Sequence, residues 1–485
     1  MQTSGIGISG FACYLPGYRV RLEDWCGWTG NAWDKVQEVV GYSYRLRGPD
    51  ENAYTMAATA ALRLILRNDV DPDRIGLLGL GTESSTDNSA GAVIVKGMVN
   101  VALRELGLSP VRRACEVPEF KHACLGGVYA LKAAARYLAV DGSDKVAVVV
   151  CSDVAEYRRD SSGEPTQGAG AVAMLVEPRG RLLAMDLHHT GSSSAYRGVD
   201  FRKPMARFAG SVRGPFVQLR DHPVFNGKYS TTCYLDAVLA AGRDYFSQCG
   251  GAPAATLRDM AAIFLHRPYQ RMSETGLAFC YLLALALGDA EDLDELGELA
   301  AATDVPLPQL IDELREQPDV EALLADGDLA AELFPLASAA ARVLRGLPAF
   351  AGLMTSLGID AMRHTGNLYT ASLPAWMAAG IEQAATEERE LGGRRVLTVG
   401  YGSGDAAEFM PMRFVDGWQA AARRIDFAGA MAGGRDVDAA EYAALHAGDD
   451  LGERISRPGV FYIDSIGERR GHFDDSGIEY YRYQG

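Results

Sequence analysis

Positive charge is in short supply in this chain of 485 residues, which has 47 lysines and arginines against 63 acidic residues and a formal net charge of −16. Nucleic-acid-binding proteins generally carry a basic surface, so this balance argues against a nucleic-acid partner. Long apolar runs are also lacking, because the longest, Phe279 to Leu287, is far shorter than the roughly 20 residues of a membrane span. Met1 to Phe11 lacks the basic start and apolar run of a signal peptide. We therefore expect a soluble, cytoplasmic protein without a membrane partner.

Cysteine is sparse, and its spacing excludes the common zinc patterns. The eight cysteines are scattered, with no CxxC pair and no Cys/His spacing typical of a metal site. The adjacent histidines His188 and His189 are too isolated to count as a site. We therefore expect no metal ion, and reduced, buried thiols for seven of the eight cysteines.

Short apolar runs alternate with helical patterns, which predicts an α/β fold. Continuous apolar runs, typical of strands covered on both faces, occupy residues 75–81, 145–151, 169–176 and 395–400. Helical patterns lie at residues 56–66, 128–140, 235–246 and 373–385. A buried strand that ends in a small-residue turn occurs in both halves of the chain, which hints at a duplicated fold.

The segment Asp289 to Glu332 has a different composition, rich in Leu, Ala, Asp and Glu, with Arg315 as its only basic residue. Its spacing predicts one to three amphipathic helices, for example Leu307 to Glu316. We interpret it as a solvated helical insertion, and a specific docking role is the less favoured alternative. From about residue 430 the chain looks irregular until a final predicted strand, Arg457 to Ile463.

One cysteine, Cys124, lies in the segment KHACLGG (121–127), directly before a predicted helix. A helix N-terminus favours the thiolate, which is the nucleophilic form of cysteine. The small residues after Cys124 would keep bulk away from the sulfur on the side where a substrate approaches. The segment therefore indicates an acyl-transfer enzyme with a thioester intermediate. A small buried cysteine at a helix start fits this motif equally well.

Other candidate residues lie at the ends of predicted elements. Glu83 follows the strand at 75–81 and could act as a general base, although a capping or solvated residue has the same appearance. His266 ends an apolar run, as core histidines commonly do. The segments around Asn367 and Ser403 are turn-like in composition.

Together these motifs resemble those of 3-hydroxy-3-methylglutaryl-CoA synthases, which are thiolase-fold condensing enzymes. The resemblance runs from about Gly5 to the end of the chain and follows the family's order of motifs. The ten motifs are TMAATAA (55–61), GTESSTD (81–87), HACLGG (122–127), CSDVAEY (151–157), GEPTQGAGAVAML (163–175), VDFRKP (199–204), NGKYSTTCYL (226–235), FLHRPY (264–269), GNLYTAS (366–372) and YGSG (401–404). The glutamate of the GTE motif favours this branch over the ketoacyl synthases of the same fold.

The resemblance implies a thiolase fold, with duplicated α/β halves in a layered αβαβα arrangement. Residues 1–180 would carry Glu83 and Cys124, and residues 181–420 would carry the remaining site residues and the acidic insertion at about 289–345. Residues 421–485 would be a C-terminal extension packed on the second half. Members of the family are typically dimeric, so we expect a homodimer.

The resemblance also implies a mechanism. Cys124 would take an acetyl group from acetyl-CoA as a thioester, and Glu83 would remove a proton from its methyl group. The resulting enolate would attack the keto carbon of an acetoacetyl thioester that is oriented by His266 and hydrogen-bonded by Asn367. The backbone N–H groups of Cys124 and Ser403 would form the oxyanion hole. Water would then hydrolyse the enzyme thioester, without a metal or redox cofactor.

Four residues within the matching motifs are second-tier candidates. Asp153 and Asp200 would orient catalytic groups, although structural hydrogen bonding fits both equally well. Lys228 would meet a phosphate of the pantetheine-bearing substrate, with a solvated surface lysine as the alternative. Tyr369 is a candidate substrate-binding residue.

The chain departs from the family at Leu125, because members usually have Tyr directly after the nucleophile. The change removes a hydroxyl and an aromatic wall close to the acyl site. If the enzyme has an unusual substrate, we therefore expect this position to be where the difference from the family matters.

The resemblance leaves the carrier of the acceptor open. Members of the mevalonate pathway use acetoacetyl-CoA, whereas members from polyketide assembly lines act on a β-keto group held on an acyl carrier protein. A local basic segment, with Arg202, Lys203, Arg207 and Arg213, could meet an acidic carrier protein or the phosphates of CoA. A second candidate among enzymes is a ketoacyl-synthase-III-like acyltransferase with an idle Glu83. An alternative from another class is a catalytically retired scaffold that binds acyl carriers.

Overall fold

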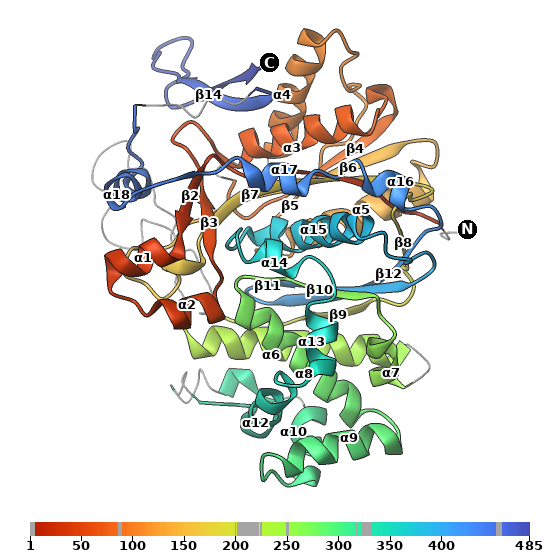
Figure 1. The fold of residues 1–485 in the computed structure, drawn as a ribbon. Coiled ribbons are helices and arrows are strands. Elements are labelled where there is room, and N and C mark those ends of the chain that lie inside the picture. The colour runs from red at the N-terminus through yellow and green to blue at the C-terminus, as the bar shows by residue number, and fades with distance from the viewer. Residues whose placement is uncertain are drawn as a thin grey trace.

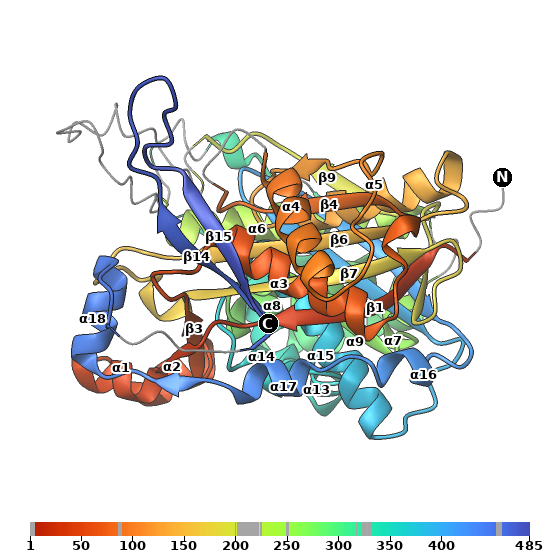
Figure 2. The same ribbon diagram turned by 90° about the horizontal axis from the view of Figure 1, so that it is seen from above.

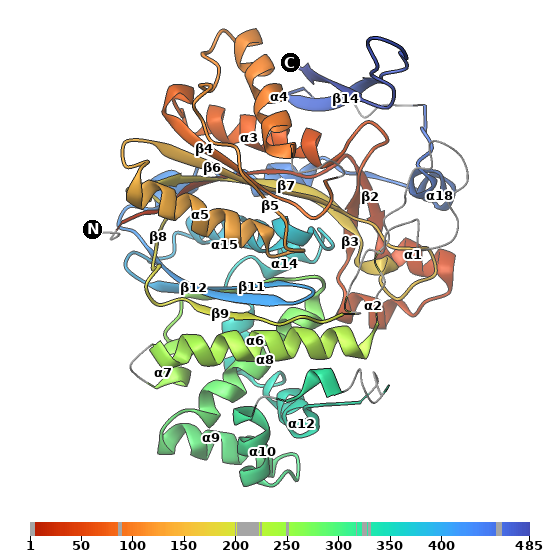
Figure 3. The ribbon, with the colours of Figure 1, turned by 180° about the vertical axis from the view of Figure 1, so that it is seen from behind.

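Alternating layers of helices and strands make up the body of the computed structural model (Figures 1 and 3). The structure describes residues 5–85, 90–198, 200, 223, 226–248, 252–316, 318–322, 327, 331–452 and 458–485. One outer layer holds α3 (Ala53–Arg67) and α4 (Gly91–Glu105). The central layer holds α5 (Gly126–Val140) and α15 (Ser372–Thr386), between two layers of strands. These layers confirm the αβαβα arrangement expected from the sequence.

The strands form two sets that are joined at one short strand. Hydrogen bonds connect them in the order β10-β11-β12-β8-β1-β7-β6-β4-β5. The first set comprises β1 (Gly7–Tyr14), β4 (Ile75–Gly81), β5 (Glu119–Phe120), β6 (Val146–Ala155) and β7 (Gly168–Glu177). The second comprises β9 (Gly191–Ser194), β10 (Ala262–Leu265), β11 (Arg395–Gly402) and β12 (Ala406–Phe414). β8 (Leu183–Met185) pairs with both β1 and β12 and so links the two sets.

Burial on both faces explains the composition of the central elements. Every residue of β4 is buried, and β6 and β7 each have nine buried residues and one of intermediate exposure. α5 and α15 lie between the two sets of strands and are rich in Ala, which lets the strands approach closely. The succession of a buried helix, a strand and an antiparallel strand occurs twice, as α5–β6–β7 and as α15–β11–β12.

The second set of strands is covered by α6 (Lys228–Gln248) and α8 (Gln270–Ala286) on its outer face (Figure 3). The acidic insertion packs against α8 as α9 (Ala290–Ala301), α10 (Leu307–Arg315) and α12 (Pro335–Leu344). Leu296, Leu310 and Leu314 are fully buried in this packing. The prediction of amphipathic helices is confirmed, and the solvated interpretation applies only to their outer faces.

Smaller elements complete the described part of the chain. Near the N-terminus these are β2 (Tyr18–Arg21), α1 (Leu22–Thr29), α2 (Trp33–Val39), β3 (Ser43–Leu46), η1 (Pro72–Arg74) and η2 (Glu164–Thr166). In the second half they are α7 (Pro253–Arg258), α13 (Pro348–Met354), α14 (Ile359–Met362), η4 (Tyr369–Ala371) and α16 (Gln419–Ala422).

The C-terminal extension is more regular, and more widely packed, than the sequence suggested. It contains α17 (Phe427–Ala432), β13 (Arg435–Asp436), α18 (Ala439–Ala447) and a hairpin of β14 (Val460–Ile466) and β15 (Glu479–Gln484). The expectation of an irregular region after residue 430 was wrong, because Asp438 and Glu441 form a capping box that starts α18. α17 packs on α15 of the second half, whereas β13 pairs with β2 and the hairpin packs on α3 and α4 (Figure 2).

No helix among the described residues combines the length and apolar character that crossing a bilayer requires. The seven described cysteines are free and buried, and Cys249 lies outside the described residues. A cytoplasmic location stays a prediction from the sequence.

Candidate active site

Cys124 lies in the short connection between β5 and α5, at the wall of a cavity of about 760 Å³. The preceding residue, Ala123, has a φ of +40°, in the left-handed region that side chains other than Gly seldom adopt. Backbone strain of this kind is concentrated at functional sites, where the surrounding structure holds it. The strained turn places the sulfur at the cavity, although only 8% of the residue is exposed.

The glycines after Cys124 have a different role from the one expected. A Cβ on Gly127 would lie 2.3 Å from the Sγ of Cys151 in β6, and a Cβ on Gly126 would lie 2.5 Å from the carbonyl oxygen of Phe120 in β5. Neither glycine lines the cavity. They therefore allow α5 to pack closely against the strands, and this packing holds Cys124 in place. The expectation that these glycines leave room for a substrate beside the sulfur was wrong.

Leu125 likewise faces the protein interior. Its side chain is fully buried, and it does not line the cavity. A Cβ on Gly402 would lie 2.8 Å from the Cβ of Leu125, and one on Gly400 would lie 2.7 Å from its Cδ1. The expected direct effect of Leu125 on the acyl pocket was therefore wrong, because the side chain fills space against β11.

Glu83 contacts the nucleophile directly. The Cys124 thiol donates a hydrogen bond to Oε2 of Glu83, with an Sγ–O distance of 3.7 Å. Glu83 lies two residues beyond the end of β4, so the strand end predicted from the sequence brings this carboxylate to the start of α5. A carboxylate in this position can accept a proton from the thiol or from a group bound to the sulfur.

Asp153 in β6 anchors the turn that carries Glu83. Its Oδ1 accepts hydrogen bonds from the backbone N–H groups of Glu83 at 2.7 Å and Ser84 at 2.9 Å. Its Oδ2 accepts from the backbone N–H of Thr370 at 2.9 Å and from that residue's hydroxyl at 2.5 Å. Burial raises the pKa of Asp153, and these hydrogen bonds oppose the rise. One buried carboxyl thus ties the Glu83 turn to the segment that follows Asn367.

His266 directly follows β10, and its backbone N–H donates to the carbonyl of Val399 at 2.7 Å. Only 2% of the residue is exposed, and its ring centroid lies 6.3 Å from that of Tyr401. Burial lowers the pKa of His266 to about 3. The ring that lines the cavity is therefore a neutral imidazole near neutral pH, which can donate or accept a hydrogen bond without carrying charge.

Asn367 lines the cavity beside two tyrosines. Its Oδ1 accepts a hydrogen bond from the Tyr369 backbone N–H at 2.9 Å, and its Nδ2 donates to the Tyr157 hydroxyl at 3.4 Å. Tyr157 and Tyr369 pack edge to face, with centroids 6.4 Å apart, and form a buried cluster with Cys124. Burial raises the pKa of both phenols, so these hydroxyls stay neutral.

The other candidates divide between the cavity and its surroundings. Ser403, just after β11, and Lys228, the first residue of α6, both line the cavity. Asp200 does not line it, and its Oδ2 instead accepts a hydrogen bond from the Tyr401 hydroxyl at 3.2 Å. The cavity therefore brings together five candidates from distant parts of the chain, namely Cys124, Lys228, His266, Asn367 and Ser403.

The wall of the cavity includes a part of the acidic insertion. Leu333 and Phe334, directly before α12, line it together with Met272 of α8. The Phe334 ring packs edge to face on Phe279, with centroids 5.7 Å apart. Among the described residues, the insertion thus contributes to the cavity through the segment before α12 and through Ser338 of α12. The basic segment with Arg202, Lys203, Arg207 and Arg213 lies outside the described residues.

Sequence reasoning missed three polar residues around the site, Tyr157, Tyr401 and Asp405. Tyr157 and Tyr401 lie within the motifs CSDVAEY and YGSG, in which Asp153 and Ser403 were selected as candidates instead. Asp405 follows the second motif directly, and its hydrogen bond from Tyr401, at 3.0 Å, gave no sequence signal. A tyrosine that lies in an apolar strand resembles an ordinary core residue until its neighbours are known.

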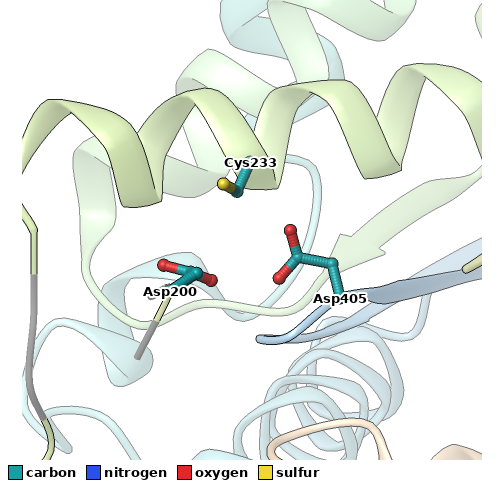
Figure 4. Close-up of side chains that lie close together, drawn as sticks. All are labelled: Asp200, Cys233 and Asp405. Carbon is teal, nitrogen blue, oxygen red and sulfur yellow. The ribbon is translucent and has the colours of Figure 1, made fainter. Parts of the chain in front are cut away.

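Within the described residues, one set of side chains brings three potential metal-ligand atoms within 4.8 Å of one another, namely Asp200, Cys233 and Asp405 (Figure 4). Metal ligands have to be deprotonated, whereas burial raises the pKa of the Cys233 thiol far above neutrality. The Tyr401 hydroxyl also hydrogen-bonds to both carboxyls. The set therefore fits hydrogen-bonded acids better than it fits a metal ion.

Comparisons with known proteins identify relatives of the whole chain. The family model "Hydroxymethylglutaryl-coenzyme A synthase N terminal" matches residues 2–181, and the corresponding "C terminal" model matches residues 354–443. A hydroxymethylglutaryl-CoA synthase from Ganoderma lucidum is 29% identical over 419 residues, which cover 84% of this chain and 79% of the relative.

Solved structures give the same result for the fold. MvaS in complex with 3-hydroxy-3-methylglutaryl coenzyme A matches with a TM-score of 0.76 and 29% identity, covering 99% of this chain and all of that one. The HMG synthase of the curacin biosynthetic pathway, in complex with holo donor-ACP, matches with a TM-score of 0.69 over 99% of both chains. Its identity is 18%, so this second likeness concerns the fold alone. The thiolase fold expected from the sequence is confirmed.

Proposed function

The chain belongs to the hydroxymethylglutaryl-CoA synthase family of condensing acyltransferases, and we propose that it joins an acetyl group held on Cys124 to the keto carbon of acetoacetyl-CoA. The hydrogen bond from the Cys124 thiol to Glu83, at the wall of a cavity that His266 and Asn367 also line, carries this proposal. This arrangement brings together a nucleophile, a base and two polar side chains that can bind a second substrate.

Acetylation is the first step. The sulfur of Cys124 attacks the carbonyl of acetyl-CoA, a thioester forms on the enzyme, and the thiol proton leaves with coenzyme A. Glu83 accepts the hydrogen bond of the thiol, so it is placed to take up this proton before the proton is passed to coenzyme A. The backbone N–H groups of Cys124 and Ser403 stabilise the oxyanion, and one such donor is commonly worth about 10²- to 10³-fold in rate.

Carbon–carbon bond formation follows on the same sulfur. Glu83 removes a proton from the acetyl methyl group, and the enolate carbon attacks the keto carbon of the acceptor. The neutral imidazole of His266 and the amide of Asn367 hydrogen-bond the acceptor's carbonyl oxygens. The proton held by Glu83 passes to the new alkoxide, which restores the carboxylate and leaves a tertiary alcohol.

Hydrolysis ends the cycle. Water adds to the enzyme thioester, the bond to sulfur breaks, and the product leaves as a free carboxylic acid at that end, with Cys124 restored as a thiol. Each of these steps uses groups of the chain, the substrates or water, so we propose that no metal or redox cofactor takes part. Activity that survives dialysis against a chelator is the expected result.

Binding of the second substrate depends on residues around the catalytic group. Lys228 and Lys35 line the cavity, and we propose that Lys228 pairs with a phosphate of coenzyme A. Tyr369 does not line the cavity but packs in a buried cluster with Cys124, and Asp153 positions Glu83 through the backbone of Glu83. Lysines bind phosphates as point charges, so this contact supplies affinity but little stereochemical control.

A homodimer is part of the proposal. β5 lies at one edge of the sheet order, and its Glu119 accepts a hydrogen bond from the first residue of α4 at 2.8 Å. Val93 and Val101 of α4 and Leu106 and Leu108 just after it are exposed. Exposed apolar residues beside a sheet edge are a feature of many subunit interfaces. Light scattering after gel filtration should give the mass of two chains.

The activity is tested by product analysis with two acceptors. The protein is mixed with acetyl-CoA and either acetoacetyl-CoA or acetoacetyl-acyl carrier protein, and products are identified by mass spectrometry. We expect 3-hydroxy-3-methylglutaryl-CoA from the first mixture, none with Cys124→Ala, and normal yield with Cys280→Ala, which alters another buried, free cysteine. Product from the carrier protein alone would change the acceptor to a carrier-bound one. No product from either acceptor would overturn the proposed condensation.

A further inference from the structure

Two buried carboxyl groups, those of Asp200 and Asp405, face each other (Figure 4). Asp405 lies between β11 and β12, and Asp200 lies on the segment after β9. Their residues are 2% and 1% exposed. Neither lines the cavity, but Tyr401 and Ser403, which do, lie on the strand end and turn that lead to Asp405.

The Tyr401 hydroxyl lies between the two carboxyls. It is 3.0 Å from Oδ1 of Asp405 and 3.2 Å from Oδ2 of Asp200. A phenol has one proton, so it can donate to only one of these oxygens. If both carboxyls were ionised, the second contact would join two acceptors at hydrogen-bond distance, which is repulsive. The geometry therefore requires one more proton, carried by the carboxyl pair.

Among the described residues, few groups compensate two negative charges here, and the Ser230 side chain hydrogen-bonds to Asp200 and opposes the rise in its pKa. Within the part of the chain that the structure describes, Arg197 is a cation near the pair, and its guanidinium pairs with Asp236 at 2.7 Å. Cys233 on α6 faces the pair as a neutral thiol, because burial raises its pKa. Tyr229 on α6 and Tyr401 are also neutral, since burial raises the pKa of each phenol. The Gly404 backbone N–H donates to Oδ1 of Asp405 and is the one backbone donor to the pair that the described hydrogen bonds include.

We propose that Asp200 and Asp405 share one proton and act as a positioning pair, which holds Tyr401 and the Ser403 turn in place beside the acyl site. The shared proton lets the Tyr401 hydroxyl bridge both carboxyls. It also limits the pair to one negative charge near the site where an enolate and an oxyanion develop. Loss of the proton adds a second charge and breaks one of the two bridges.

The electrostatics of the pair agree with this assignment. Burial, followed by the neighbouring Asp200, raises the pKa of Asp405 to about 8. Burial also raises the pKa of Asp200. Like-charged carboxyls at short distance behave in this way, because the first ionisation opposes the second. The pair therefore holds its proton at neutral pH and loses it as the pH rises through about 8.

Folding stability tests the shared proton without any assay of activity. The folded state keeps a proton that an unfolded Asp loses near its ordinary pKa of about 4. Folding stability therefore falls as pH rises from about 4 to about 8 and levels off above that range. Asp405→Asn removes this dependence, so its melting temperature relative to the wild type should increase between pH 5 and pH 8. Asp259→Asn, at an exposed carboxylate paired with Arg395, should show no such trend.

The second measurement rests on the proposed function and follows kcat for condensation against pH. We expect wild-type kcat to fall with a midpoint near pH 8, and Asp405→Asn to keep activity at pH 7 and lose this fall. Asp405→Ala, which breaks the bridge, should lower kcat by about 10- to 100-fold with a smaller change in KM.

Three results would overturn the shared proton: the same alkaline fall in Asp405→Asn and wild type, a pH-independent difference in melting temperature, or one bound divalent metal ion per chain by elemental analysis. Lack of any condensation product would overturn the proposed function instead, while the melting experiment would still decide the question of the proton.

Discussion

At the scale of single residues, the chain's motifs predict which side chains act, and the structure shows how these side chains are held. Cys124, His266 and Asn367 could be selected from the sequence because they stand in ordered motifs. The anchoring role of Asp153 could only be proposed in outline, because its partners Glu83 and Thr370 are 70 and 217 positions away. Hydrogen bonds over such separations depend on the packing of β6 against its neighbours, which local sequence does not encode.

Replacement of Asp153 should mainly impair catalysis by Glu83. Asp153→Asn turns one acceptor oxygen into an NH₂ group that faces N–H and O–H donors, so the Glu83 turn should shift. We expect kcat for condensation to fall by about 10- to 100-fold, with KM for acetyl-CoA nearly unchanged. Thr82→Val, which removes only one donor to the same carboxyl at 3.1 Å, is the control and should change kcat far less. Equal losses in both variants would contradict the anchoring role.

The buried, neutral state of His266 has a consequence for stability. Its pKa of about 3 lies below that of an unfolded His, so the unfolded state binds more protons as pH falls below about 6.5. This residue should therefore cost the protein about 1.4 kcal/mol of stability per pH unit between about pH 6 and pH 4. Urea denaturation should show that the free energy of unfolding of His266→Gln falls less steeply with decreasing pH than that of the wild type over this range. Parallel curves would show that His266 is protonated in the folded protein.

At the scale of helices and strands, the central elements were predicted almost to their ends, and the periphery was not. Buried strands such as β4 read as uninterrupted apolar runs, which are a strong local signal. α6 begins at Lys228, earlier than the predicted start at Leu235, because its first turns carry Ser and Thr that propensity disfavours. The insertion's amphipathic pattern predicted its helices, but no local signal could show that α12 reaches the cavity.

The contribution of the acidic insertion to the cavity wall is tested at Leu333, two residues before α12. Leu333→Ala removes apolar surface that lines the cavity, so KM for the acceptor should rise severalfold while acetylation of Cys124 is unchanged. Ile311→Ala truncates a partly buried residue of the same insertion that is not part of the wall, and serves as the control. Steady-state kinetics with acetoacetyl-CoA distinguish the two variants. An equal rise in KM for both would assign the effect to general loosening of the insertion.

At the scale of the whole molecule, the site is assembled between two sets of strands, each of which supplies part of it. The family resemblance predicted this layered arrangement, whereas composition alone indicated only alternating strands and helices. Polar contacts between the central helices and the strands were invisible in the sequence. One of them is the ion pair between Lys132 of α5 and Glu408 of β12, at 2.6 Å, in which the side chains are 6% and 5% exposed.

Removing one partner of this buried ion pair should destabilise the protein strongly, whereas replacing both residues with apolar ones should destabilise it little. Glu408→Ala leaves the Lys132 ammonium buried without its partner, so we expect a loss of about 3–5 kcal/mol in the free energy of unfolding. The double variant Lys132→Met, Glu408→Leu removes both charges and should recover most of that loss. Chemical denaturation of the single and double variants measures the coupling. Additive effects would show that the two residues act independently.

The central claim is that Cys124 carries the acetyl group and that Glu83 withdraws the proton for condensation. Intact-protein mass spectrometry after addition of acetyl-CoA tests it most directly. We predict one acetyl adduct on the wild type and on Glu83→Gln, and none on Cys124→Ala. Added acetoacetyl-CoA should discharge the adduct from the wild type but leave it on Glu83→Gln. An adduct on Cys124→Ala, or normal discharge by Glu83→Gln, would contradict the account.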